Sequence, residues 1–263
     1  KIEGRCTSMK IADIIETIER FAPPALQEDW DNTGLQTGDK AAECTGALVC
    51  VDATECAVHE AVELGCNLII THHPLFFKGV KSLTGDTAVQ RTAIAAVRSG
   101  VAIYSCHTSV DNAEGGVSWE MAAKLGVTVQ KTLDAAGCGV IGTLDAALTP
   151  AGLVERVKAV FGSPVARCTR IPELKTIERV AMCGGSGSFL IPVAIHDGAQ
   201  AFITSDCKYH DFVDYADDIL LIDIGHYESE KCTKEIFLRI LSEKIPNFAV
   251  YNSATEQNPI NYL

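Results

Sequence analysis

The sequence predicts an α/β fold made of two intimately packed α/β halves, with a metal site at the carboxyl ends of the strands. Three apolar runs carry this prediction, because each is typical of a buried strand and each is followed by histidine and carboxylate groups. Functional groups in open α/β sheets gather beyond the carboxyl ends of the strands, so we expect the three runs to deliver one site. The runs are residues 67–71, 101–104 and 219–223.

The first half begins with an amphipathic helix between Met9 and Arg20, whose isoleucines recur at helical spacing and which Pro23-Pro24 ends. A strand, a helix and a strand follow as a β-α-β unit, for which parallel pairing is expected. Gly126 ends the last helix of this half. The predicted elements after the first helix are strand 47–51, helix 55–64, strand 68–71, helix 87–98, strand 101–105 and helix 117–125.

The second half begins near Val140 and alternates strands with helices in the same way. Thr149 is expected to cap a helix that has Pro150 at its first position. The tail from Asn252 has too little pattern to assign. The predicted elements are strand 140–146, the helix from Pro150, strand 178–183, the loop Gly184–Gly187, helix 189–196, strand 201–204, helix 207–216, strand 219–223 and helix 227–242.

These elements divide the chain into an N-terminal α/β half, residues 9–135, and a C-terminal α/β half, residues 136–263. Ile2-Glu3-Gly4-Arg5 is typical of an engineered protease-cleavage site. We therefore expect residues 1–8 to be an expression-tag remnant and the natural chain to begin at Met9.

Composition restricts the classes of partner and compartment. The 263 residues are 47% hydrophobic, enough for a sizeable core, and the net charge of −12 would repel nucleic acid. No apolar run approaches the length of a membrane span. The 11 cysteines are scattered and never form C-x-x-C, which favours reduced thiols and a cytoplasmic protein.

Histidine and carboxylate residues at the strand ends favour a metal centre. Neighbouring side chains on a strand point to opposite faces, so His72 and His73 suit two ions better than one unless the backbone turns there. His226 and Glu230 are four residues apart, on one face of a helix, and Asp111 could bridge two ions. This mixture of nitrogen and oxygen ligands suits two divalent transition-metal ions such as Zn, Fe, Mn, Co or Ni.

Each of these residues also has an ordinary interpretation. A histidine at a strand end is commonly a polar surface residue, and a His/Glu pair is commonly a solvated helix face. Their joint occurrence is what favours the metal interpretation. His107 could be a further ligand or could position Asp111.

Two further segments could contact a ligand. The loop Gly184–Gly187 could offer its amides to an anion or could be a tight turn. Asp206, Lys208 and His210 could meet a polar ligand at a strand end, whereas Ser205 or Asp206 could instead cap a helix.

Four motifs together resemble the GTP cyclohydrolase 1 type 2 family, also called NIF-three-like proteins, over about residues 9–251. The resemblance implies a two-domain α/β subunit, a dinuclear metal centre and a homohexameric ring with the sites facing an internal cavity. The ligands that it implies are His72, His73, Asp111, His226 and Glu230. Thr204-Ser205-Asp206 departs mildly from the Thr-Gly-Asp of the family. The motifs are Trp30–Gln36, Thr71–Phe77, His107–Asp111 and Gly225–Glu230.

Two hypotheses about function follow. In the first, the protein is a dinuclear metal-dependent hydrolase whose activated water attacks a nucleotide or phosphate ester, in the manner of a GTP cyclohydrolase, with His107 or His210 as proton carrier. In the second, the protein is a non-catalytic metal-binding or regulatory interaction protein. A catalytic centre retains exchangeable water positions and a structural centre is closed, and five protein ligands for two ions leave positions vacant, which favours catalysis.

Overall fold

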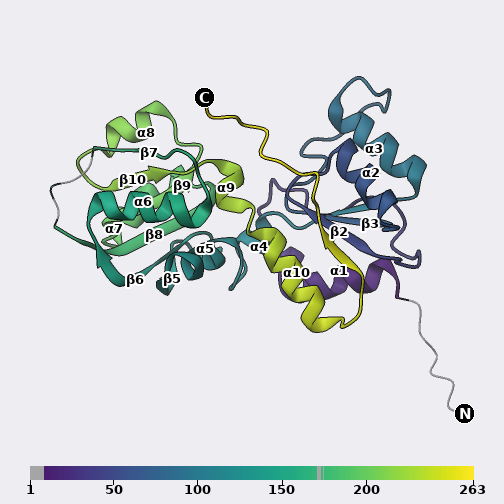
Figure 1. Cartoon of the computed structure of the whole chain (residues 1–263), viewed down its shortest axis with the longest axis horizontal. Helices are drawn as coiled ribbons and strands as arrows, with labels where there is room; N and C mark the ends of the chain where they lie inside the picture. Colours follow the sequence, from purple (N-terminus) through teal and green to yellow (C-terminus); the bar gives the residue numbers. More distant parts are fainter. Residues whose placement is uncertain (1–8, 171–172, 174) are drawn as a thin grey trace, which may run out of the picture. The chain divides into compact units, whose positions relative to one another are not determined.

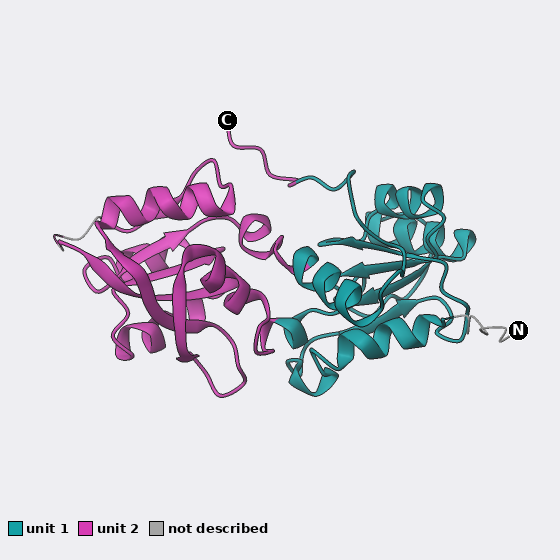
Figure 2. Cartoon of the chain, turned by 60° about the horizontal axis from the view of Figure 1, so that its bottom comes forward, with its two compact units in different colours: residues 1–110, 234–257 teal, residues 111–233, 258–263 magenta. Residues whose placement is uncertain are grey.

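The computed structural model describes residues 9–170, 173 and 175–263 (Figure 1). The predicted tag remnant, residues 1–8, lies outside the described residues. The chain forms two compact units, each built on its own sheet (Figure 2). Unit 1 comprises the residues up to Val110 together with Lys234–Gln257, and unit 2 comprises Asp111–Thr233 together with Asn258–Leu263.

These units differ from the predicted halves, which met between residues 135 and 136. The difference arises because the chain returns to the first sheet near its end. Strand β11 (Val250–Asn252) pairs in parallel with β2 (Ala47–Cys50) and so joins the first sheet. Strand β11 could not be recognised from the sequence, because its three residues are too few to show an alternating pattern and its pairing partner β2 lies about 200 residues away.

Unit 1 contains a five-stranded sheet in the order β1-β4-β3-β2-β11. Strands β2, β3 and β4 pair in parallel, as the β-α-β pattern predicted, and β1 is an antiparallel edge strand. Every residue of β2, β3 and β4 is buried, which is typical of parallel strands covered on both faces. The remaining strand bounds are β1 (Gly34–Thr37), β3 (Leu68–Thr71) and β4 (Ala102–Ser105).

Helices α2 (Glu55–Glu63) and α3 (Ala88–Ser99) cover one face of this sheet, where their alanines pack against Leu48, Ile69 and Ile103. Side chains of Thr54 and Thr87 cap the two helices at their N-termini. The other helical elements of the unit are α1 (Ile11–Glu19), the 3₁₀ turn Pro24–Leu26, α4 (Thr108–Asp111) at its boundary and α10 (Thr233–Lys244).

Unit 2 contains a six-stranded sheet in the order β5-β6-β8-β9-β10-β7. Strands β8, β9 and β10 are parallel, whereas β5, β6 and β7 pair in antiparallel fashion. The strands are β5 (Val127–Thr132), β6 (Val140–Leu148), β7 (Arg167–Cys168), β8 (Ile177–Ser186), β9 (Ala201–Ser205) and β10 (Leu220–Asp223).

The helices of unit 2 follow the predicted order, with one correction. Thr149 caps α6 and Pro150 is its first residue, as predicted. The predicted helix 227–242 is broken into α9 and α10, because the hydroxyls of Ser229 and Thr233 bond to the carbonyls of His226 and Glu230 and compete with helical hydrogen bonds. The bounds are α5 (Val117–Leu125), α6 (Pro150–Phe161), α7 (Ile191–His196) after the 3₁₀ turn Ser188–Leu190, α8 (Tyr209–Asp214) and α9 (His226–Glu230).

The segment Gly184–Gly187 is a second correction. Strand β8 continues through Ser186, so most of the predicted loop belongs to the sheet. Gly185 has a φ of +62°, which a glycine adopts without strain and which bends the strand at this point. Among the described residues, none belongs to a helix with the length and apolar character needed to cross a membrane.

Candidate metal centre

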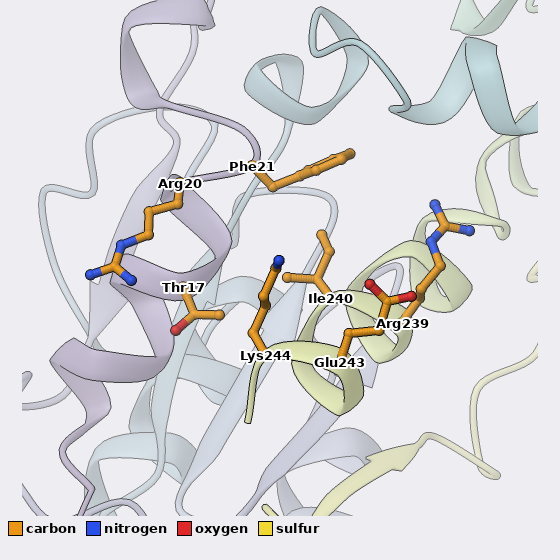
Figure 3. A pocket seen from close by; sticks show the side chains of 7 residues that line it. All are labelled: Thr17, Arg20, Phe21, Arg239, Ile240, Glu243 and Lys244. Carbon is orange, nitrogen blue, oxygen red and sulfur yellow. The ribbon is translucent and has the colours of Figure 1, made fainter. Parts of the chain in front are cut away.

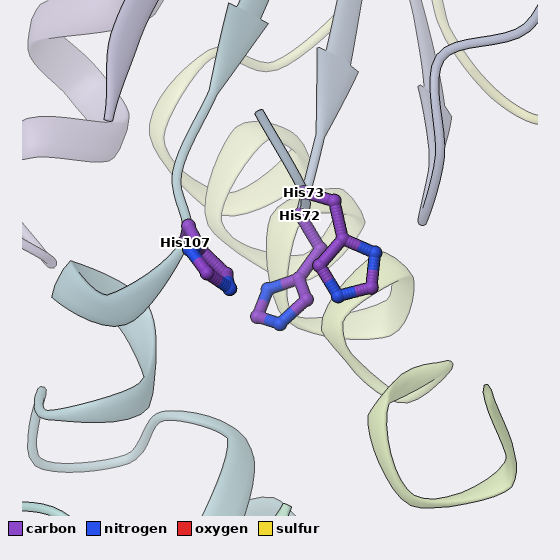
Figure 4. A group of neighbouring side chains, drawn as sticks. All are labelled: His72, His73 and His107. Atoms are coloured by element: carbon purple, nitrogen blue, oxygen red, sulfur yellow. The ribbon is translucent and has the colours of Figure 1, made fainter. Parts of the chain in front are cut away.

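Unit 1 holds a group of three histidines, His72, His73 and His107, which we call the histidine cluster (Figure 4). His72 and His73 directly follow β3, and His107 lies two residues beyond β4. Because β3 and β4 are neighbouring parallel strands with Thr71 opposite Ser105, both strand ends meet at one edge of the sheet. One nitrogen of each ring lies within 4.8 Å of the others.

The backbone turns at the pair of adjacent histidines. Residues 72 and 73 form a bend, and the carbonyl of His73 accepts hydrogen bonds from the hydroxyls of Thr71 (2.7 Å) and Ser105 (3.1 Å). The ring centroids of His72 and His73 therefore lie only 4.8 Å apart. Because the backbone turns here, the two rings do not point to opposite faces of a strand, and their adjacency does not indicate whether they bind one ion or two.

A carboxylate holds the Nδ1 atom of two of these rings. Asp52, two residues after β2, lies 2.9 Å from Nδ1 of His73. Asp31 lies 2.8 Å from Nδ1 of His107. Histidines that bind metal ions commonly donate their other ring nitrogen to a carboxylate, which fixes the tautomer and the orientation of the ring. With Nδ1 engaged in this way, both rings have Nε2 left to present to the site.

Asp31 is the more deeply embedded of the two carboxylates. Its side chain is fully buried and accepts hydrogen bonds from His107, from the backbone and hydroxyl of Thr108, and from the hydroxyl of Thr33. Burial alone would raise the pKa of Asp31, but these hydrogen bonds and the charge of His107 outweigh it and hold the pKa well below its usual range. Asp31 is therefore an anion that orients His107.

Unit 2 presents the second group of predicted ligands at the start of α9. His226 Nε2 lies 2.9 Å from Oε2 of Glu230, as the spacing of four residues predicted for one helix face. His226 Nδ1 lies 2.7 Å from Oδ2 of Asp206. Burial opposes a charge on His226, but hydrogen bonds and charges from Glu230 and Asp206 raise its pKa to about 9. A bound metal ion would replace this proton.

Asp206 is held in a strained conformation. Its φ is +55°, a left-handed conformation that residues other than glycine rarely adopt. The strain points its carboxylate at Ser186, whose hydroxyl donates a hydrogen bond of 2.6 Å, and at His226. Backbone strain of this kind persists where the surroundings over-determine a residue, and it is concentrated at functional sites.

Gly185 packs directly against Glu230. A Cβ atom built on Gly185 would lie 2.0 Å from Oε1 of Glu230 and 3.5 Å from a carbon of the His226 ring. The amides of Gly185 and Gly187 donate to the hydroxyls of Ser229 and Thr204. The Gly185 amide therefore supports α9 and the Gly187 amide bonds to β9 (Ala201–Ser205), so neither of these two amides is available to an anion, one of the two interpretations that the sequence left open.

The remaining predicted residues lie as follows. Asp111 is partly buried at the end of α4, in unit 2. His210 is exposed on α8, with its ring centroid 5.4 Å from that of Tyr209. Neither Ser205 nor Asp206 caps α8; Asp211 does so, by accepting a hydrogen bond of 2.7 Å from the backbone of Lys208.

Sequence reasoning assigned no role to the carboxylates of Asp31 and Asp52. Asp52 follows a buried strand, so the strand-end rule that selected His72 could have found it. Asp31 precedes the short edge strand β1 and had no such signal. Its role depends on the loop that brings it to His107, 76 residues away.

The described part of the structure contains two hollows, and the candidate ligand His226 lines one of them. In unit 2, a hollow of about 290 Å³ is lined by His226 and Asp206 together with Arg167, Asp223 and Tyr262. In unit 1, a hollow of about 590 Å³ lies between α1 and α10, with Phe21, Ile240 and Lys244 on its walls (Figure 3). Neither His72, His73 nor His107 lines the second hollow, so we assign it no part in the candidate centre.

The donor set fits a transition metal. Imidazole nitrogens close enough to share an ion, with the rings of His73 and His107 held by carboxylates, suit Zn, Fe, Co or Ni, and carboxylate oxygens extend the set to Mn. The histidine cluster is thus a group that could hold a metal ion, and the His226–Glu230 pair offers a nitrogen and an oxygen donor 2.9 Å apart.

The profile of the family described as Duf34/NIF3 (NGG1p interacting factor 3) matches residues 9–259 of the chain. The chain belongs to this family. A relative from Lactococcus lactis, named GTP cyclohydrolase 1 type 2 homolog, is 36% identical over 260 residues, covering 95% of this chain and 98% of the relative. A Nostoc protein of the same name is 37% identical, covering 85% of this chain and 88% of its own length.

Solved structures confirm the NIF3 fold. A hypothetical protein from Staphylococcus aureus superposes with a TM-score of 0.87 at 28% identity, covering 97% of this chain and 99% of its own. A Bacillus cereus protein related to NIF3 also gives a TM-score of 0.87, at 21% identity, covering 97% and 100%. The prediction of a NIF-three-like α/β fold is confirmed.

Proposed function

We propose that the chain is a metal-dependent hydrolase with a centre of two divalent transition-metal ions. The proposed ligands are His72, His73, Asp111, His226 and Glu230. The observation that carries the proposal is the histidine cluster, in which oriented rings converge at the carboxyl ends of two strands. The assignment of these five residues to one centre rests on the order of their motifs in the sequence.

Bound ions of this kind lower the pKa of a water molecule and so supply a nucleophile near neutral pH. His107 is the proton carrier in the proposal. Its Nδ1 is bonded to a buried, charged Asp31, which orients the ring and would stabilise the imidazolium after a proton is taken up. His210 remains a second predicted carrier.

The proposed substrate is a nucleotide or phosphate ester. Trp30 and Phe77 are 66% and 54% exposed, and both rings contact His107 edge-on, with centroids 5.9 and 5.5 Å from its ring. Exposed aromatic faces beside a candidate centre suit a planar base, which stacks on them. In a GTP-like purine the atom attacked would be C8. The name GTP cyclohydrolase 1 type 2 homolog, carried by the relatives, supports this class of substrate.

The test is a screen of metal-reconstituted protein against nucleotides and phosphate esters, with the metal-free protein as blank. His107→Ala should retain its metal and lose turnover by about 10²-fold or more, since it removes the proton carrier. His59→Ala, an exposed histidine on α2, is the matched control and should behave as the unaltered protein. Turnover that is equal in the two variants would contradict the role of His107.

The alternative is a non-catalytic metal-binding or regulatory interaction protein. The description of the family as an interacting factor favours it. Full metal loading without turnover of any substrate, and without an exchangeable water position on the ions, would support this alternative over hydrolysis.

The proposed assembly is a hexameric ring in the cytoplasm, whose sites face a shielded cavity and admit only small molecules. The ten cysteines in the described range form no disulfides, which suits that compartment. Light scattering should report a mass six times that of the 28.1 kDa chain. A stable monomer that retains its metal would contradict the ring.

A further inference from the structure

Cys138 and Cys183 bring two thiols into contact in unit 2. Their Sγ atoms lie 3.7 Å apart, in a hydrogen bond for which either can be the donor. The register of the sheet explains the contact, because β6 and β8 are antiparallel with Val140 opposite Met182. Cys138 lies two residues before Val140 and Cys183 one residue after Met182.

The backbone around Cys138 is fixed by a turn. The amides of Gly137 and Cys138 both donate to Oδ1 of Asp134, at 2.9 and 2.8 Å. Gly137 and Gly139 have φ values of +105° and +63°, which the turn requires. Cys183 is held by the sheet and packs in the core of the unit. Neither thiol therefore owes its position to a flexible segment.

The two thiols differ in environment. Cys138 is partly exposed, whereas Cys183 is 4% exposed. The hydrogen bond with Cys138, burial, and the charges of Cys138, Asp111 and Glu230 raise the pKa of Cys183 well above its ordinary value. A reagent from solvent reaches Cys138 first, and Cys183 is the protonated neighbour behind it.

We propose that Cys138 and Cys183 form a redox modification site that a hydroperoxide converts to a disulfide. Cys138 sulfur attacks the O–O bond, so that a sulfenic acid forms on Cys138 and the hydroperoxide leaves as an alcohol or water. Cys183 sulfur then attacks the sulfenic sulfur. The S–S bond forms, the S–O bond breaks, and the hydroxyl leaves with the Cys183 proton as water. Both thiols are oxidised and one hydroperoxide is reduced.

The closing movement is small. A disulfide has an S–S distance of about 2.05 Å, so the sulfurs must approach by about 1.7 Å, which side-chain rotation can supply. The alternative interpretation is that both cysteines are only small core residues. The two interpretations predict different products of oxidation. Cysteines that are only core residues would give no preferred disulfide, whereas the proposed site gives one defined disulfide between Cys138 and Cys183.

The proposed site is linked to the ligand helix α9 through the backbone. Gly184 follows Cys183, and its amide donates to Ser118, while the next amide, of Gly185, donates to Ser229 of α9. Gly185 has no spare room against Glu230. Displacing Cys183 should therefore disturb Glu230 and weaken metal binding, a consequence that rests on the proposed metal function.

Treatment of the full chain with a stoichiometric hydroperoxide, followed by thiol counting and peptide mapping, tests the proposal. We expect two of the 11 thiols to be lost, a 138–183 cross-link, and full recovery with a thiol reductant. Cys138→Ser and Cys183→Ala should each abolish the cross-link, and Cys56→Ser, at an exposed cysteine, should keep it.

Absence of the 138–183 peptide while Cys56 oxidises would overturn the proposal. Because two variants are used, one that fails to fold leaves the other as a test. Metal retention is measured separately on the oxidised and reduced protein. Equal retention would overturn only the link to α9, whereas the mapping decides the modification site itself.

Discussion

Removing the carboxylate behind His73 should weaken metal binding without unfolding the protein. Asp52 lies 2.9 Å from Nδ1 of His73 and is 51% exposed, whereas the His73 side chain is only 12% exposed. The carboxylate therefore orients a ligand from the solvent side of the site. Asp52→Ala removes both the hydrogen bond and the negative charge, and Asp52→Asn keeps an oxygen that accepts the hydrogen bond but loses the charge.

The expected magnitudes follow from this geometry. Loss of a carboxylate that supports a metal-bound histidine typically lowers metal affinity 10–100-fold, about 1.4–2.7 kcal/mol, and we expect this loss for Asp52→Ala. Asp52→Asn should lose about tenfold or less, because the ring keeps its orientation. An ion pair with a half-exposed carboxylate contributes under about 1 kcal/mol to folding, so the metal-free variants should unfold nearly as the original chain does.

Competition with a chromophoric chelator measures the affinities, and denaturant unfolding of the metal-free proteins measures the stabilities. Asp217→Asn is the matched control, since Asp217 is 83% exposed and pairs only with exposed Arg170 in the described structure. If both Asp52 variants bind metal as tightly as the control, the carboxylate does not support a ligand and the reasoning is refuted.

Three further predictions concern Glu60, Trp30 and Gly185. Glu60 accepts four hydrogen bonds from Ser253, Ala254 and Thr255, and these outweigh burial and lower its pKa. Its contribution to stability is therefore present above the unfolded-state pKa and is lost as the pH falls through the folded-state pKa. Glu60→Gln should lower the free energy of unfolding by about 2–4 kcal/mol near neutral pH and make it depend less on pH in acid. Trp30 lies against His107, so binding of Co²⁺ or Ni²⁺ should quench its fluorescence. Trp30→Phe leaves Trp119, whose indole nitrogen is buried, as the remaining tryptophan and should abolish the quenching. Gly185→Ala should reduce metal content far more than Gly198→Ala, because both positions have positive φ but only Gly185 crowds Glu230; equal metal content would contradict this.

Much of the fold could be predicted because local patterns and burial agreed. The parallel strands β2, β3 and β4 were recognisable as short apolar runs with a helix between them. Strand β11 and the edge strands β1 and β7 could not be recognised. They are two to four residues long and owe their pairing to partners distant in sequence.

Candidate ligands could be selected from the sequence, but the carboxylates that orient the histidine rings could not. His72, His73, His226 and Glu230 were selected by residue type and by their place after a strand. The carboxylates of Asp31, Asp52 and Asp206 act on histidines 20 to 76 residues away, so only the folded chain shows which ring each one orients. The strained φ of Asp206 likewise has no sequence signal.

The proposed function depends on two divalent transition-metal ions bound by the five proposed ligands. Diffraction from metal-loaded crystals at the absorption edge of the bound metal tests it most directly. We expect two anomalous peaks per chain, with His72, His73, Asp111, His226 and Glu230 each contributing an atom about 2.0–2.3 Å from an ion. A single ion held by His72, His73 and His107 alone, or peaks remote from the proposed ligands, would contradict the proposal.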